Sequence, residues 1–157
     1  MLFRLIDLPI KYLLPKFLIF LLLSSSLSSA FAQNDLVDVS LISKKIAEDY
    51  YSVGIKFDIK KDWHIYWKNS GESGAPTKVE WLLSNDANPK ALKWPIPEVF
   101  IERGNIITYG YSDEVVLLSD ISTTNIDNIK AKVSWLACKD ICIPGSAEVT
   151  YLSLIHI

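Results

Sequence analysis

Residues 131–151 read AKVSWLACKDICIPGSAEVTY and hold the only two cysteines of the 157-residue chain. The segments on either side of the cysteines are apolar and rich in β-branched residues, which favours strands. Three residues separate Cys138 from Cys142, and Asp140 among them tolerates a turn conformation. We therefore expect a tight hairpin in which the two cysteines face each other, with their Cα atoms about 4.5 Å apart.

This cysteine spacing differs from that of a thioredoxin-like site, which has two residues between its cysteines and lies in a βαβ unit. A disulfide between Cys138 and Cys142 would close a very short loop and remove little entropy from the unfolded chain. The stabilisation would be about 2 kcal/mol at most. A redox role is therefore favoured, and two alternatives stay open. One is a non-catalytic β-sandwich that binds a partner and has a structural disulfide. The other is a copper-handling domain in which the two thiolates, with His64, bind Cu(I).

The rest of the chain contains short strand-like segments with turn signals between them, and little helical periodicity. This pattern predicts an all-β fold, an antiparallel sandwich. The expected segments are Val37–Leu41, Val53–Ile59, Trp63–Trp67, Lys78–Leu82, Trp94–Pro97 as an extended edge, and Val115–Leu118 as a strand buried on both faces.

The aromatic strand Trp63–Trp67 would send Trp63, Ile65 and Trp67 to one face and His64 and Tyr66 to the other, because side chains alternate along a strand. Residues 69–76 then form a loop rich in Gly, Ser, Asn and Pro. We expect the five tryptophans of the chain to lie in the core. A lone histidine such as His64 is more often a satisfied strand-face residue than a ligand.

Residues 1–32 have the pattern of an export signal. Basic residues precede the apolar run Phe17–Leu23, and a serine-rich stretch ends at Ala30-Phe31-Ala32, which predicts cleavage after Ala32. An uncleaved membrane anchor is the alternative, although the run is shorter than the roughly 20 residues that a spanning helix needs. Export would place the cysteine pair outside the cytosol, where close thiols form disulfides.

The charge of the remaining chain gives no sign of a nucleic-acid partner. Without residues 1–32, 13 Lys and Arg stand against 17 Asp and Glu, a net charge of −4, and no basic run occurs. Residues 33–151 are long enough for one domain. Residues 152–157 can be back-translated to a transposase adaptor of sequencing libraries, which predicts a non-native tail and a natural protein that continues past about Tyr151.

Four ordered motifs resemble the amino-terminal periplasmic domain of the thiol:disulfide interchange protein DsbD and its relatives, including the copper-sensitivity-suppressor (ScsB-like) branch. The resemblance covers about residues 36–151. The motifs are WHIYWKNSGESGAPT (63–77), WPIP (94–97), YGY (109–111) followed by EVVLL (114–118), and CKDICIP (138–144).

The resemblance implies an immunoglobulin-like β-sandwich in the periplasm whose cysteine pair relays electrons. In this family a membrane-embedded domain reduces a thioredoxin-like domain, which reduces the amino-terminal domain, which then reduces disulfide isomerases or cytochrome-maturation proteins. Cys138 and Cys142 match the redox pair, and the segment from Tyr66 to Gly74 matches the cap over it. No cofactor or metal is expected. Since no membrane or thioredoxin-like domain follows here, we expect either a fragment of an inner-membrane protein or a stand-alone acceptor domain.

Exchange chemistry requires a reachable, partly ionised cysteine. Lys139 would favour a thiolate on Cys138, and Asp140 would oppose it. Three tyrosines are expected to shield the pair, and one glutamate to guide a proton to the leaving thiolate, although core aromatics and a solvated glutamate are the alternative interpretations. These candidates are Tyr66, Tyr109, Tyr111 and Glu72.

Overall fold

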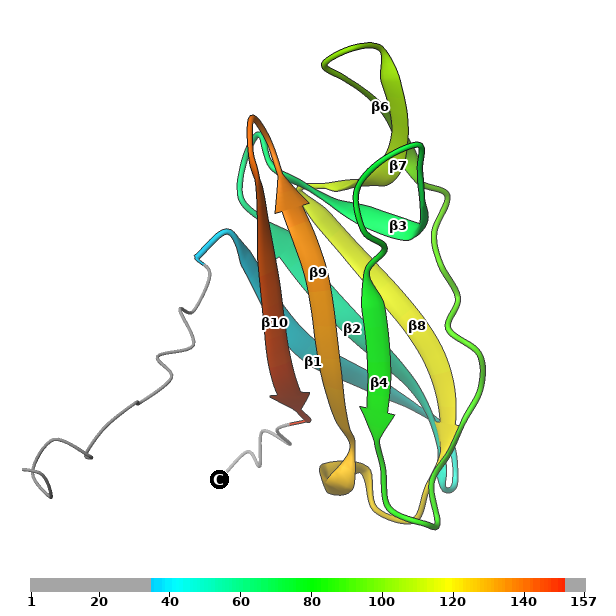
Figure 1. The fold of residues 1–157 in the computed structure, drawn as a ribbon. Coiled ribbons are helices and arrows are strands. Elements are labelled where there is room, and N and C mark those ends of the chain that lie inside the picture. The colour runs from blue at the N-terminus through cyan, green and yellow to red at the C-terminus, as the bar shows by residue number, and fades with distance from the viewer. Residues whose placement is uncertain (1–34, 152–157) are drawn as a thin grey trace, which may run out of the picture. The chain divides into compact units, whose positions relative to one another are not determined.

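The computed structural model describes residues 35–151, which form ten strands and one 3₁₀ turn (Figure 1). The predicted export signal, residues 1–32, and the tail, residues 152–157, lie outside the described residues. No helix in the described part could cross a membrane. The elements are β1 (Val37–Ala47), β2 (Tyr50–Ile59), β3 (His64–Gly71), β4 (Lys78–Leu82), β5 (Asn88–Pro89), β6 (Glu98–Glu102), β7 (Ile106–Ser112), β8 (Glu114–Ser122), η2 (Ile126–Asn128), β9 (Lys130–Cys138) and β10 (Cys142–Thr150).

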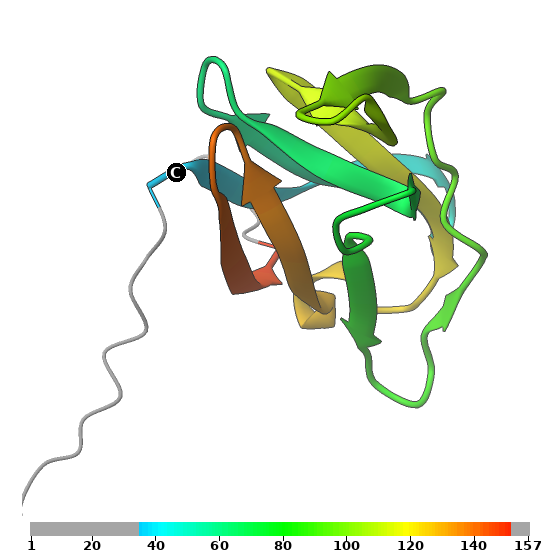
Figure 2. The same ribbon diagram turned by 45° about the horizontal axis from the view of Figure 1, so that its top comes forward.

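The strands form two antiparallel sheets that pack as two layers (Figures 1 and 2). One sheet has the order β1-β2-β8-β5, and the other has the order β10-β9-β3-β7-β6, with β4 paired to β9. Sequential hairpins join β1 to β2, β6 to β7 and β9 to β10. The predicted all-β antiparallel sandwich is therefore confirmed.

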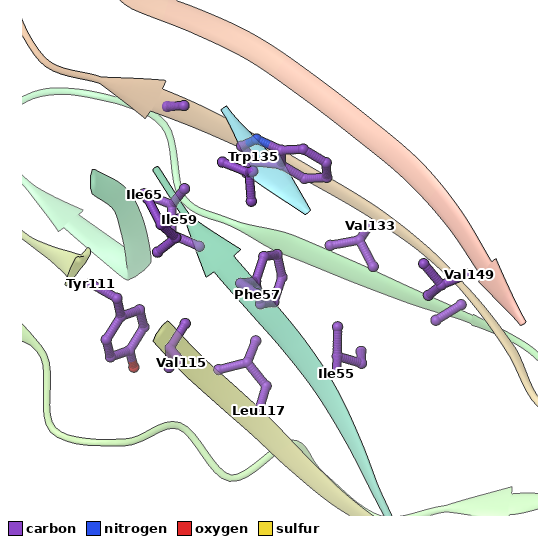
Figure 3. Packing of buried hydrophobic residues seen from close by; sticks show 13 residues of the cluster. Ile55, Phe57, Ile59, Ile65, Tyr111, Val115, Leu117, Val133, Trp135 and Val149 are labelled. Carbon is purple, nitrogen blue, oxygen red and sulfur yellow. The ribbon is translucent and has the colours of Figure 1, made fainter. Parts of the chain in front are cut away.

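Alternating apolar residues of β2, β8 and β9 fill the space between the sheets. Phe57 lies at the centre, and its ring meets that of Trp135 edge-on at 6.1 Å between centroids (Figure 3). As expected, the tryptophans belong to the core: Trp135 is buried, and the four that pack against the same cluster are Trp63, Trp67, Trp81 and Trp94.

Two of the strand predictions were wrong in detail. Val115–Leu118 is not buried on both faces: Val115 and Leu117 point into the core, whereas Leu118 is 39 % exposed, because β8 covers the core with one face only. Trp94–Pro97 is not a strand. One edge strand of the second sheet, β6, directly follows Pro97.

A register shift between β3 and β7 shapes the end of the molecule that holds the cysteines. Tyr66 pairs with Gly110, but the next pairing is Gly71 with Thr108. Gly110 is required at this point because a Cβ there would overlap the carbonyl oxygen of Ile65. Side chains of β6 thereby come to lie over His64 and Tyr66, on the face of β3 that points away from the core.

Candidate redox site

The β9–β10 hairpin brings the two cysteines together. Cys138 ends β9 and pairs directly with Cys142, the first residue of β10. Their Cα atoms are 4.1 Å apart and a disulfide joins them. The Lys139 N–H donates to the Ile141 carbonyl across the three-residue loop, at 3.1 Å. The hairpin expected from the cysteine spacing is therefore confirmed.

The two sulfur-bearing residues differ sharply in accessibility. Cys138 is 1 % exposed, because β9 is flanked by β3, where His64 is its pairing partner. Cys142 is exposed at the start of β10, where one neighbouring strand is missing. A reagent approaching from solvent therefore reaches Cys142 before Cys138.

A pocket of about 450 Å³ opens beside Cys142. Its walls come from the turn between β2 and β3, the β6–β7 hairpin and the cysteine loop, and the first and last of these turns lie side by side (Figures 1 and 2). Two exposed ion pairs link the walls: Arg103 to Asp140 at 3.1 Å, and Lys139 to Asp62 at 3.2 Å. The remaining lining residues are Trp63, His64, Phe100, Ile101, Glu102 and Ser112.

One tyrosine hydroxyl stands between a carboxylate and the accessible sulfur. The Tyr66 hydroxyl donates to Glu102 Oε1 at 2.9 Å, and its oxygen is 3.9 Å from Cys142 Sγ. The Thr108 hydroxyl donates to the same carboxylate oxygen at 3.0 Å. Burial, together with Glu102, raises the pKa of Tyr66 well above its usual value, so this hydroxyl keeps its proton and can act as a donor.

His64 lies next to this cluster. Its ring stacks on Phe100 at 4.3 Å between centroids and meets Tyr66 edge-on at 5.3 Å. Its Nε2 is 3.6 Å from Glu102 Oε1. Burial lowers the pKa of His64 below its usual 6.5, and Glu102 acts in the opposite direction. The imidazole is therefore mostly neutral at pH 7.

Of the three tyrosines predicted to shield the pair, Tyr66 is the one that the structure places against Cys142. Tyr111 points into the core, where its hydroxyl donates to the Pro95 carbonyl at 2.8 Å and burial raises its pKa to about 12. Tyr109 packs edge-on against Trp67, 6.5 Å between centroids. These two rings support the sheet beside the site.

The structure places Glu72 in a different role from Glu102. The Glu72 carboxylate is exposed and accepts the Ile107 N–H at 2.7 Å, while its own N–H donates to the Ile107 carbonyl at 3.0 Å. It thus ties the end of β3 to β7. Sequence reasoning missed Glu102, the carboxylate beside Cys142; the alternation of Glu98, Phe100 and Glu102 on one face of a strand is the signal that could have found it.

Of the segment predicted to cap the pair, Tyr66 to Gly74, the first residue lies against Cys142 Sγ and the last covers the Tyr66 ring. Gly74, with φ of +81°, lies directly on the Tyr66 ring, so that a Cβ there would overlap the ring atoms. The pocket wall beside Cys142 comes from the β6–β7 hairpin. Within residues 35–151, no group of three or more His, Cys, Asp or Glu side chains is arranged to hold a metal ion.

Comparison with known proteins gives a consistent family. The family described as "Thiol:disulfide interchange protein DsbD, N-terminal" matches residues 33–154. The chain is similar to the N-terminal periplasmic domain of ScsB from Proteus mirabilis, with 25 % identity and a TM-score of 0.62 over 76 % of this chain. It spans 47 % of that ScsB chain. None of the curated proteins compared matches it.

The Neisseria meningitidis DsbD N-terminal domain in its reduced form is also similar in fold, with a TM-score of 0.52 and 12 % identity over 82 % of this chain and 94 % of that one. The sandwich is accordingly immunoglobulin-like. The disulfide between Cys138 and Cys142 fits a thiol–disulfide interchange domain. This chain belongs to the family of DsbD N-terminal domains of thiol:disulfide interchange proteins.

Proposed function

We propose that residues 33–151 form a periplasmic domain that relays two electrons through Cys138 and Cys142 to other thiol–disulfide proteins. One observation carries the proposal: the disulfide joins neighbours that the β9–β10 hairpin already aligns, and it presents one sulfur-bearing residue to solvent beside a polar pocket. A bond in that position adds little stability, about 2 kcal/mol at most, and is open to attack.

The exchange begins at Cys142. A thiolate of a dithiol donor attacks Cys142 Sγ, a new S–S bond forms between donor and Cys142, and the Cys138–Cys142 bond breaks. Cys138 leaves with the electron pair and takes up a proton. The second donor thiolate then attacks the donor sulfur, and Cys142 is released with its own electron pair. The donor ends as a disulfide, and the two electrons lie on the domain's dithiol.

The reduced pair would pass these electrons on by the reverse steps, with Cys142 as the attacking thiolate. The Tyr66 hydroxyl can donate to that thiolate, since it lies 3.9 Å from the sulfur and keeps its proton. A hydrogen bond to a charged acceptor is stronger than one to a neutral acceptor. Tyr66 therefore stabilises the thiolate form of Cys142.

The partners we propose are thioredoxin-like domains and disulfide isomerases. Exposed apolar side chains lie on the β6–β7 hairpin and on the cysteine loop, two of the elements that line the pocket, which suits the docking of a protein surface. Ile101 on β6 is 74 % exposed and pairs with Ile107 on β7, while Ile141 in the cysteine loop is 63 % exposed. A membrane electron-transfer domain in a longer natural chain is the proposed upstream source.

The proposal is tested by mixing the oxidised domain with a reduced thioredoxin-like protein and counting free thiols by mass. We expect the donor to convert the disulfide into two free thiols, on Cys138 and Cys142. The double variant Cys138→Ser, Cys142→Ser should gain no free thiols and should leave the donor reduced. Failure of the donor to reduce the domain faster than a simple monothiol would contradict the proposal.

Single variants test which sulfur reacts. For this test the reduced variants are mixed with oxidised glutathione. Cys138→Ser keeps the exposed cysteine, whose thiolate should attack one glutathione sulfur, form a mixed disulfide and release the other glutathione as a thiol. The mixed disulfide should accumulate, because the variant has no second thiol to resolve it. Cys142→Ser keeps only the buried cysteine and should trap little. Equal trapping by both variants would contradict the assignment of Cys142 as the point of attack.

A further inference from the structure

A buried ring nitrogen beside the exchange site has no hydrogen-bond partner within residues 35–151. This atom is Nε2 of His64, although Glu102 Oε1 lies only 3.6 Å away. Leaving a buried polar atom unpaired is unfavourable, and such an atom in a native protein calls for an explanation. Stacking on Phe100 and the edge contact with Tyr66 hold the imidazole where it is.

The carboxylate that Nε2 faces already has two donors. In the disulfide form, the hydroxyls of Tyr66 and Thr108 both donate to Glu102 Oε1. Tyr66 has a single O–H and therefore cannot serve Glu102 and a second acceptor at once. After reduction, two acceptors compete for the Tyr66 O–H, because a thiolate on Cys142 would be a charged acceptor 3.9 Å from the Tyr66 oxygen.

We infer that His64 is a positioning residue for exchange: when Cys142 becomes a thiolate, the imidazole takes up a proton, its Nε2–H replaces Tyr66 as donor to Glu102, and the Tyr66 O–H turns to the sulfur. The inference rests on the proposed exchange function. When the mixed disulfide with the donor breaks, its electron pair stays on Cys142. A proton from solvent is then held on His64 instead of on the sulfur.

The charges around the imidazole support this coupling. The acidic groups that face His64 come from β6, and Cys138 and Cys142 lie on the hairpin next to it. A thiolate would add a further negative charge, and negative charges favour the protonated form of an imidazole. The charged and titratable groups around the ring are Glu98 and Glu102 of β6, Tyr66 of β3, Cys138 and Cys142, and the ion-paired Asp62, Lys139, Arg103 and Asp140 of the pocket rim.

The disulfide form sets the starting point. There, burial outweighs Glu102 and lowers the pKa of His64, so that the ring is neutral at pH 7 and its Nε2 contact with Glu102 is long. Reduction followed by thiolate formation adds a negative charge near the ring. That charge favours the protonated imidazole, which burial disfavours. Proton uptake by His64 is therefore tied to the redox state of the pair.

The test is the pH profile of Cys142 alkylation in the reduced domain. Iodoacetamide reacts with thiolates, and the modified cysteine is identified by mass after proteolysis. The variants are His64→Gln and His64→Phe, the second of which preserves stacking on Phe100. At pH 8 we expect both variants to be alkylated at Cys142 within about two-fold of the parent rate. Near pH 5.5 their rates should be about ten-fold below that of the parent, because one hydrogen bond to a charged group accounts for about that ratio. Parallel profiles for parent and both variants would overturn the inference.

Glu102→Gln provides the second measurement. Because His64 acts through Glu102, this variant should lose the same low-pH advantage, and the double variant His64→Gln, Glu102→Gln should lose no more than either single variant. Additive losses would overturn the coupling. A purely structural role of His64 would lower stability without changing the shape of the pH profile.

The alkylation experiment needs no protein partner, so its outcome is separable from that of the exchange test. If a thioredoxin-like donor reduces the domain but the alkylation profiles of parent and variants are parallel, the proposed role of His64 is wrong and the exchange function stands. If the parent is alkylated faster than the His64 variants at low pH but the donor does not reduce the domain, the relay function is wrong. The coupling between His64 and Cys142 would still stand.

Discussion

The two faces of β3 are both covered, but by different kinds of side chain. On one face, Ile65 lies in the apolar core among residues of β2, β8 and β9. On the other, His64 and Tyr66 are covered by β6 and by Gly74, and their contacts run to Glu102 and Cys142. The first face holds the sandwich together through apolar burial, and the second arranges hydrogen-bonding groups at the disulfide. Stability and chemistry should therefore respond to different substitutions.

The largest effect on stability is expected in the core. Phe57→Ala removes a fully buried ring that packs against Trp135, and should lower the free energy of unfolding by about 3–5 kcal/mol. Replacing both cysteines by serine should lower it by about 2 kcal/mol at most, because the disulfide closes so short a loop. Chemical denaturation of both variants measures the difference. A larger loss from the cysteine variant would make the disulfide chiefly structural.

The next largest effect on stability is expected at Gly74, which packs on the Tyr66 ring, and Gly104 serves as a control for backbone strain alone. Gly74→Ala and Gly104→Ala both place a Cβ on a residue with positive φ, but a Cβ at Gly104 has open space around it, whereas one at Gly74 overlaps the Tyr66 ring. Gly104→Ala should cost about 1 kcal/mol from backbone strain. Gly74→Ala should cost roughly 1–3 kcal/mol more from overpacking, which thermal unfolding will measure. Equal losses would mean that the segment does not hold Tyr66 in place.

A pair of tyrosine variants tests whether the two faces of β3 are chemically distinct. Tyr66→Phe and Tyr111→Phe each remove one hydroxyl hydrogen bond, and each should lower stability by about 1 kcal/mol. Tyr66→Phe alone should slow the alkylation of Cys142 at neutral pH, because the thiolate loses a donor. The rate is followed by mass after reduction. A similar slowing in Tyr111→Phe would point to a general change of the sheet.

The smallest effect concerns pH and the oxidised domain. His64 has a lower pKa when folded than its usual 6.5, so the unfolded chain binds more protons in the range just below that value. The stability of the domain should therefore fall as pH drops through 6.5 and below it. In His64→Gln this part of the decline should be absent. Denaturation midpoints at several pH values measure it; identical declines in both proteins would contradict the burial of a neutral imidazole.

The sequence could predict the parts of the fold that depend on local pattern. The spacing of Cys138 and Cys142 predicts the hairpin, and the alternation along Trp63–Trp67 predicts which side chains share a face; both are confirmed. The alternation does not reveal that His64 and Tyr66 are themselves buried, because their cover comes from β6, more than thirty residues further along the chain.

The parts that escaped prediction depend on long-range pairing. β6 exposes Val99 and Ile101 and turns Glu102 inward, the reverse of what hydrophobicity alone indicates for a strand. The register shift after Tyr66 brings that strand over the site, and no short sequence pattern marks it. For the same reason Glu72, in the glycine-rich loop that follows the aromatic strand, is a more obvious candidate from the sequence than Glu102.

The reduction potential of the Cys138–Cys142 pair distinguishes an exchange disulfide from a structural one. The domain is equilibrated with graded thiol redox buffers, and trapped thiols on the two cysteines are counted by mass. We expect a potential in the range of catalytic dithiols, about −180 to −270 mV. A potential well below about −300 mV would mean a structural disulfide and would contradict the exchange function.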